Sequence, residues 1–421
     1  MREPHRIEAS PGAITRVPGF RAAGVACGLK ESAQPDLALV VCDRPATAAA
    51  MFTTNAFKAA PVLYDQALLA RGGAGRDATS TIQAVVINAG NANACTGAQG
   101  LRDAEHMARL AEAALGLPAR SVFVMSTGII GQPMPMAKAA AGIEAAAKEL
   151  STAGGAQAAR AIMTTDLVPK EASLRLDLGG VIISLAGMAK GSGMIHPSLA
   201  SATAPHATML AVLVTDAAIS APALDAALAG AVGASFNRIT VDGDTSTNDT
   251  VVALASGKAG NPPLEPGTSA YASFAQALGE VCTSLAKQIA RDGEGATRLV
   301  EILVQGAAND AEAELAAKAV ATSPLVKTAI FGADPNWGRV LAAIGRSGAR
   351  VDPGRVNLWL GPIQLVGAGE PLPFDPAAAR AALQEAEVRL TGDLGLGLGQ
   401  AMVWTCDLSY KYVEINAEYH T

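Results

Sequence analysis

Short apolar runs bounded by Pro, Gly or Asp recur along the chain and predict β-strands. Each has the length of a strand and is rich in Val, Ile, Leu or Ala. The run 209–214 is entirely apolar and predicts a buried strand or the start of a helix. The predicted strands are 37–42, 48–53, 61–64, 82–88, 121–125, 181–185, 250–255, 299–304, 356–360, 402–407 and 411–415.

Longer segments with apolar residues at helical spacing lie between these runs. They predict helices at 101–115, 133–150, 222–235, 271–290, 308–320, 337–344 and 377–390. Several predicted strands follow one another with no helix between them, which argues against a purely doubly wound fold. The pattern therefore favours an α/β layered sandwich with helices outside paired sheets.

Composition and charge narrow the class of protein. Half of the residues are hydrophobic but only 4% are aromatic, so we expect a core of Ala, Val, Leu and Ile. The net charge of −6, with no basic block, argues against a nucleic-acid partner. The five cysteines are scattered and favour a reducing compartment. With no signal peptide and no apolar run long enough to span a membrane, the sequence predicts a cytoplasmic protein.

The stretch 190–210, KGSGMIHPSLASATAPHATML, contains two candidates for self-cleavage. Ala200-Ser201 and Ala207-Thr208 each place a hydroxyl residue after alanine, and a buried element follows the second pair. Cleavage before such a hydroxyl residue frees an α-amine that can act as the base for that hydroxyl. Taken alone, the stretch is better explained as an ordinary loop entering a core strand.

Sequence patterns for metal and nucleotide sites are incomplete. The five histidines form no zinc motif, and the segment 242–249, DGDTSTND, lacks the Gly and Glu of a calcium loop. We interpret that segment as a polar loop near a pocket, and we expect no metal. There is no P-loop, no complete GxGxxG and no GxSxG nucleophile elbow.

Four short stretches carry more polar chemistry than a core requires. Thr127 and Gly128 follow a predicted strand, where a hydroxyl and a backbone N–H can hold an oxyanion. The segment 163–166, MTTD, has two hydroxyls and a carboxylate, 291–297 places Glu294 between two glycines, and 415–421 ends the chain on Thr421. Singly, these are explained as a turn, a helix cap, a solvated turn and a frayed tail.

Together these stretches resemble the ArgJ family of glutamate N-acetyltransferases, also called ornithine acetyltransferases. The resemblance rests on KGSGMI…ATML, STGIIG, AIMTTDLVPK, RDGEGATR, DPNWGRVLAAIGRSG and CDLSYKYVEINAEYHT, and it runs in order from about residue 13 to the last residue. It implies an α/β/β/α-type sandwich like that of ArgJ and DmpA. It also implies self-cleavage into residues 1–207 and 208–421, which pack into one intertwined catalytic unit, with two of each chain forming a heterotetramer.

The resemblance also implies roles for particular residues. Cleavage falls between Ala207 and Thr208, and Thr208 is the nucleophile. The oxyanion pair falls on Thr127 and Gly128. The substrate-contacting residues fall on Thr164 (with Thr165 as the alternative), Lys190, Thr208, Glu294, Asn416 and Thr421.

The implied reaction moves an acetyl group from N2-acetyl-L-ornithine to L-glutamate through an acetyl-threonine, in the cyclic route of arginine biosynthesis. No cofactor is implied, although acetyl-CoA is a second candidate donor because some members of the family use it. Two alternatives remain open. One is a self-cleaving amidohydrolase or aminopeptidase of the same fold, and the other is an uncleaved, non-catalytic homologue.

One departure from the family pattern concerns the nucleophile. The family's spacing from the lysine matches Ser201, since 201 − 190 = 11, whereas Thr208 lies 208 − 190 = 18 residues from Lys190. The Met-Leu that follows the family's nucleophile follows Thr208 here. We favour Thr208 because the strand that follows it determines where the nucleophile lies in the sheet.

Overall fold

The computed structural model describes residues 7–70, 82–197, 199 and 209–418. They form two compact units. The first runs from the start of the described chain to Asn237 and includes Asp244–Ala286, and the second comprises Arg238–Gly243 and the chain from Lys287 onward. Within the described ranges, every helix is too short or too polar to cross a bilayer.

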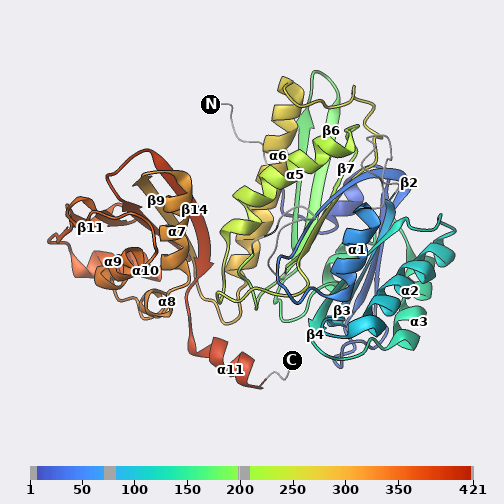
Figure 1. Ribbon diagram of the computed structural model, residues 1–421, viewed down its shortest axis with the longest axis horizontal. Coiled ribbons are helices and arrows are strands. Elements are labelled where there is room, and N and C mark those ends of the chain that lie inside the picture. The colour runs from blue at the N-terminus through green and yellow to red at the C-terminus, as the bar shows by residue number, and fades with distance from the viewer. Residues whose placement is uncertain (1–6, 71–81, 198, 200–208, 419–421) are drawn as a thin grey trace. The chain divides into compact units, whose positions relative to one another are not determined.

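In the first unit the strands pair in the order β4-β3-β2-β8-β7-β6-β5, and the long strand β2 is shared by the two sheets into which this order divides (Figure 1). The first half of β2 (Leu37–Phe52) pairs with β1 and β3, and its second half pairs with β8. The sequence predicted two strands here, but the exposed segment 43–45 stays extended and joins them. The other strands are β1 (Phe20–Val25), β3 (Ile82–Asn91), β4 (Val122–Ile129), β5 (Lys170–Asp177), β6 (Ile182–Lys190), β7 (Leu210–Thr215) and β8 (Thr250–Ala255).

The inner faces of the two sheets meet in one apolar core. Val40 and Ile87 come from one sheet, and Val212 and Val252 come from the other. Because side chains alternate along a strand, the residues between them face outward and need a second cover. The buried side chains are mainly Ala, Val, Leu and Ile, as the composition predicted.

Helices cover the outer faces of both sheets (Figure 1). On one side, α2 (Gly97–Leu115) and α3 (Met136–Glu149) share a core with outward residues of β2, β3 and β4. On the other side lie α5 (Ala221–Ala234) and α6 (Ser269–Arg291). Leu285 of α6 packs so closely on Gly187 of β6 that a Cβ there would lie 2.8 Å from it. The fold is therefore the predicted layered sandwich, helix–sheet–sheet–helix.

The second unit has a mixed sheet and its own apolar core. Its strands lie in the order β12-β11-β10-β13-β9-β14, with β13 parallel to β9. The strands are β9 (Leu299–Ala307), β10 (Asn357–Leu360), β11 (Ile363–Gly367), β12 (Glu370–Pro371), β13 (Glu387–Asp393) and β14 (Gly399–Cys406). The helices are α7 (Asp310–Ala321), α8 (Pro324–Phe331), α9 (Trp337–Gly345), α10 (Pro376–Gln384) and α11 (Tyr410–Glu418).

Two predicted strands are helices in the structure. The run 61–64 lies in α1 (Ala60–Ala70), with Pro61 in the first turn, where its missing N–H is tolerated. The run 411–415 lies in α11, none of whose side chains is buried. Both runs are short, and in short apolar runs the sequence pattern does not separate strand from helix.

The predicted helix 377–390 is also wrong in its second half. α10 ends at Gln384, and the next residue, Glu385, is extended. Val388 and Leu390 then alternate with exposed residues in β13, which pairs with β9. Only this tertiary pairing makes the extended form favourable.

The predicted chain division at 207/208 lies outside the described residues. The strands around this gap share one sheet, since β7 pairs antiparallel with β6 and parallel with β8. Residues before and after the gap therefore complete the same layer, whether or not the chain is cut. The prediction of two intertwined chains stays a prediction.

Candidate active site

Lys190 contacts two other residues that the sequence singled out, Thr127 and Thr164. It ends β6 and is only 3% exposed. Its Nζ donates to Thr164 Oγ1 at 2.8 Å and to Thr127 Oγ1 at 3.2 Å. Thr127 belongs to β4 of the other sheet, and Thr164 to the turn before β5. Both hydroxyls accept from the ammonium, so each keeps its own O–H to donate.

Asp166 anchors this cluster and was not among the predicted site residues. Its carboxylate accepts from Lys170 Nζ at 2.6 Å and from the Gly191 N–H at 2.7 Å. It also accepts from the Thr164 N–H at 3.0 Å, and its Oδ2 lies 3.9 Å from Lys190 Nζ. The signal was present in the MTTD segment, which carries this carboxylate.

The charges of the cluster are buried and interact strongly. The side chains of Asp166 and Lys170 are both 0% exposed. Burial raises the pKa of the Asp166 carboxyl, but Lys170, Lys190 and the Gly191 N–H outweigh burial and hold that pKa well below its ordinary value. Asp166 is therefore ionised and orients both lysines.

Gly128 lies where no side chain fits. Its φ is +131°, and it pairs with Gly90 of β3. A Cβ at Gly128 would lie 2.3 Å from the Gly90 carbonyl carbon and 2.5 Å from the Asn91 nitrogen. Two backbones therefore touch at the predicted oxyanion residue, and only glycine permits this contact.

Asparagine side chains support the end of β4. Asn248 Nδ2 donates to Ala92 O at 2.6 Å and to Ser126 O at 2.8 Å. Ser126 Oγ donates to Asn88 Oδ1 at 2.6 Å. The strand predicted at 82–88 continues in the structure to Asn91, the end of β3. These contacts fix the strand end that carries Thr127.

Asp249 ends the polar segment 242–249 and was not predicted as a site residue. Its side chain is buried, and neither carboxyl oxygen has a hydrogen-bond partner among the described residues. Burial raises the pKa of this carboxyl well above its ordinary value, although Lys190 acts in the opposite direction. Asp249 is therefore a weaker counter-charge for Lys190 than Asp166 is.

The second unit brings together Glu294 and Asn416. Asn416 Nδ2 donates to Glu294 Oε2 at 2.8 Å and to Tyr412 O at 3.0 Å. Glu294 lies in the loop between α6 and β9, and Asn416 lies in α11. A carboxylate and an amide from distant parts of the sequence thus form one polar pair.

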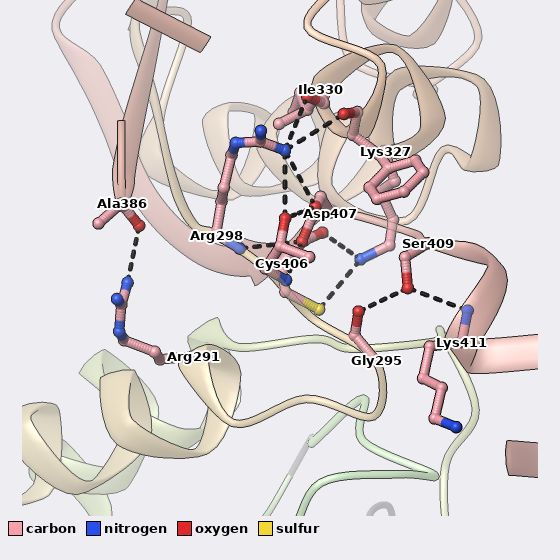
Figure 2. A network of polar contacts seen from close by, with 12 residues as sticks. Arg291, Gly295, Arg298, Lys327, Ile330, Ala386, Cys406, Asp407, Ser409 and Lys411 are labelled. Atoms are coloured by element: carbon pink, nitrogen blue, oxygen red, sulfur yellow. Dashed lines mark hydrogen bonds and ion pairs between the residues drawn. The ribbon is translucent and has the colours of Figure 1, made fainter. Parts of the chain in front are cut away.

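Asp407 and Ser409 hold the Glu294 loop, as Figure 2 shows. The buried Asp407 carboxylate accepts from the Arg298 N–H at 3.0 Å and from the Arg298 guanidinium at 3.3 Å. Ser409 Oγ donates to Gly295 O at 2.6 Å, and Gly295 has φ +70° with the Tyr412 nitrogen close against it. The loop is therefore fixed against the start of α11.

The remaining predicted site residues lie outside the described residues. These are the cleavage pair Ala207 and Thr208, the alternative nucleophile Ser201, and the terminal Thr421. Thr165, the alternative to Thr164, shares a hydrogen bond of 2.7 Å with Ser192, whereas Thr164 accepts from Lys190 Nζ at 2.8 Å. The geometry therefore favours Thr164 as the residue beside Lys190.

Known proteins resemble the chain over nearly its whole length. Residues 21–421 match the model of the ArgJ family. The arginine biosynthesis bifunctional protein ArgJ of Symbiobacterium thermophilum is 54% identical over 412 residues, covering 97% of this chain and 99% of that protein. The protein of the same name from Thermosynechococcus vestitus is 47% identical, covering 97% and 98%.

Two solved structures with high sequence identity each match about half of the chain. ArgJ from Bacillus halodurans is 51% identical, with a TM-score of 0.48 over 48% of this chain and 96% of its own. Ornithine acetyltransferase from Mycobacterium tuberculosis, in complex with ornithine, is 43% identical, with a TM-score of 0.42 over 47% and 100%. The family model and the full-length relatives establish the assignment: this chain belongs to the ArgJ family.

Proposed function

We propose that this protein transfers the acetyl group of N2-acetyl-L-ornithine to L-glutamate, releasing L-ornithine and N-acetyl-L-glutamate. Family membership and full-length relatives in arginine biosynthesis support this acyltransferase activity. The carrying observation is the Lys190 ammonium, which donates to the hydroxyls of Thr127 and Thr164 at one end of the sandwich. It combines a cation for a substrate carboxylate with a hydroxyl aligned for an oxyanion.

In the first half-reaction the Thr208 hydroxyl attacks the acetyl carbonyl of acetyl-ornithine. The α-amine of Thr208, freed by cleavage after Ala207, takes the hydroxyl proton. The oxyanion accepts hydrogen bonds from the Thr127 hydroxyl and the Gly128 N–H. The intermediate then collapses, the C–N bond breaks, and ornithine leaves with a proton on its amine.

In the second half-reaction the α-amine of glutamate attacks the acetyl-threonine. The C–O bond to Thr208 breaks, its oxygen regains a proton, and N-acetylglutamate leaves. Because Lys190 already donates to the Thr127 hydroxyl, that hydroxyl's own proton points away from the ammonium and can serve both oxyanions. The hydrogen bond from Lys190 to Thr127 therefore helps to stabilise the oxyanion of each half-reaction.

Substrate recognition in this proposal uses the charges of both amino acids. Lys190 pairs with a carboxylate as a point charge. Glu294, with Asn416 as its hydrogen-bonding partner, suits the cationic amine of ornithine, and Thr421 adds a neutral hydrogen bond. The reaction requires no cofactor, and acetyl-CoA serves only as a second donor.

We propose that the protein is cytoplasmic and that it assembles as a heterotetramer of two 1–207 chains and two 208–421 chains. Light scattering coupled to size exclusion tests the assembly. A mass equal to two copies of the whole sequence supports the heterotetramer, whereas the mass of one copy contradicts it.

Intact mass spectrometry tests the cleavage on which the mechanism depends. Two chains divided after Ala207 support Thr208 as the nucleophile. Division after Ala200 transfers the role to Ser201. A single uncut chain contradicts the mechanism and favours a non-catalytic homologue.

Substitution of the nucleophile tests the reaction itself. Thr208→Ala is expected to abolish both cleavage and acetyl transfer, since the residue directly after the scissile bond then has no hydroxyl. Thr208→Ser keeps a hydroxyl and is expected to keep both, and Ser201→Ala serves as the matched control. Acetyl-ornithine consumption that is equally fast without glutamate indicates the hydrolase alternative.

A further inference from the structure

Lys30 lies on a loop that touches the backbone of the candidate active site. The loop joins β1 to β2, and Asp36 fixes it by accepting from the N–H groups of Cys27, Leu29 and Lys30 at 2.7, 2.6 and 3.0 Å. A Cβ at Gly90 would lie 2.7 Å from Leu29 O and 3.2 Å from the Lys30 nitrogen. Gly90 in turn pairs with Gly128. The Lys30 backbone is thus one strand away from the proposed oxyanion residue.

The ammonium of Lys30 extends toward the segment that carries Thr164. Its Nζ donates to Pro35 O at 2.7 Å and to Ala161 O at 3.5 Å. Ala161 ends α4 (Gly155–Ala161), three residues before Thr164. An ammonium has three N–H donors, and the third has no partner among the described residues.

The ammonium of Lys30 lies within electrostatic reach of the candidate active site. Burial lowers the pKa of Lys30 and Lys190 lowers it further, whereas Asp36 and Asp166 act in the opposite direction. The Asp36 carboxylate already accepts from three backbone N–H groups. An anion at the third N–H of Lys30 would offset the effects of burial and of Lys190.

The proposed reaction requires such an anion subsite. Donor and acceptor both have an α-carboxylate for Lys190, but only glutamate has a second carboxylate. The cationic side-chain amine of ornithine and the anionic side-chain carboxylate of glutamate need partners of opposite charge. The side chain of glutamate therefore needs a cation that the donor does not use.

We propose that Lys30 binds the side-chain carboxylate of the acceptor glutamate and so selects a dicarboxylic amino acid. This proposal rests on the proposed function, because it assigns a subsite within the same reaction. Lys30 donates its third N–H to the carboxylate, while its bonds to Pro35 and Ala161 hold the ammonium in place.

The test compares glutamate with glutamine, its neutral isostere, as acceptors for wild type and Lys30→Met. In the variant, kcat/KM for glutamate is expected to fall at least about tenfold, the lower range for a hydrogen bond to a charged group, while that for glutamine stays within about twofold. The ornithine burst from acetyl-ornithine alone is expected to be unchanged. Lys30→Arg keeps the charge and is expected to recover most of the preference.

Lys138→Met is the matched control. Lys138 is a surface lysine that donates to Gly28 O of the same loop at 2.6 Å. An equal loss of glutamate preference in Lys138→Met shows that Lys30 only supports the loop and overturns the proposal. An unchanged glutamate-to-glutamine ratio in Lys30→Met also overturns it, as does a loss confined to acetyl-CoA as donor. Wild-type protein that never acetylates glutamate overturns the proposed function as well, whereas the other outcomes leave that function intact.

Discussion

Asp166→Asn removes a negative charge that lies between two buried lysines while keeping the size of the side chain. Lys170 is 0% exposed and loses a partner at 2.6 Å, and Lys190 loses one at 3.9 Å. Breaking a buried ion pair from one side costs about 3–5 kcal/mol. Asparagine keeps one acceptor oxygen, so we expect a loss of about 3 kcal/mol, which is a large part of the ~5–15 kcal/mol of a typical domain.

Hydrogen exchange measured by mass spectrometry is the appropriate assay. All three tryptophans, Trp337, Trp359 and Trp404, lie in the second unit, so their fluorescence does not report directly on the first. Exchange of peptides from β5 and β6 gives the opening free energy where the charge is removed. Glu144→Gln is the control, because it removes an exposed carboxylate paired with Lys148 at 2.7 Å and should leave the same peptides unchanged.

The pH dependence of the stability difference between wild type and Asp166→Asn tests the same ion pairs. The pKa of Asp166 is lower in the folded protein than its ordinary value of 3.8, so its contribution is fully present above that value. The difference between wild type and Asp166→Asn should therefore be constant at neutral pH and shrink as the pH falls below about 4. A loss of stability below about 1 kcal/mol at pH 7 contradicts the buried ion pairs, since a neutral hydrogen bond alone accounts for that amount.

Two further predictions concern Gly128 and Asp65. Gly128→Ala is expected to lower kcat at least about tenfold, because its Cβ would lie 2.3 Å from Gly90 and displace the oxyanion N–H. Gly131→Ala is the control, because Gly131 also has a positive φ of +80° but open space around it. This variant should retain kcat in the same assay. Burial raises the pKa of the Asp65 carboxyl well above 3.8, and the Val124 N–H bonded at 3.0 Å offsets this only in part. The contribution of Asp65 to stability is therefore full below pH 4 and falls as the pH rises, so the stability of Asp65→Asn relative to wild type should increase between pH 4 and 7 in denaturant titrations.

Strands with a long apolar pattern were predictable because local sequence and tertiary packing agree there. The strand β8, Thr250–Ala255, was predicted to the residue, since every residue after Thr250 is apolar and both faces are buried. The run 61–64 was wrong because its four residues satisfy either period. The second half of 377–390 was wrong because pairing with β9 stabilises an extended form that local propensity does not favour.

In the candidate site, too, some features were visible in the sequence and others were not. The motifs singled out Thr127, Thr164 and Lys190, and the structure brings these three side chains together. The burial of Asp166 and Asp249 was not predicted, because a carboxylate in a polar segment has no sequence signal for burial. Their importance comes from the lysines that the fold brings near them.

The sequence by itself determined the family and the layered α/β class and singled out the candidate site residues, because apolar period and residue type are local properties of the chain. Tertiary structure alone decided that Lys190 donates to Thr127 and Thr164, and that Asp166 is ionised between two buried lysines. It also placed the Lys30 loop against Gly90, beside the strand of Gly128. These relations depend on distances between segments remote in sequence and on the removal of water from their charges, and neither quantity is encoded in any short stretch.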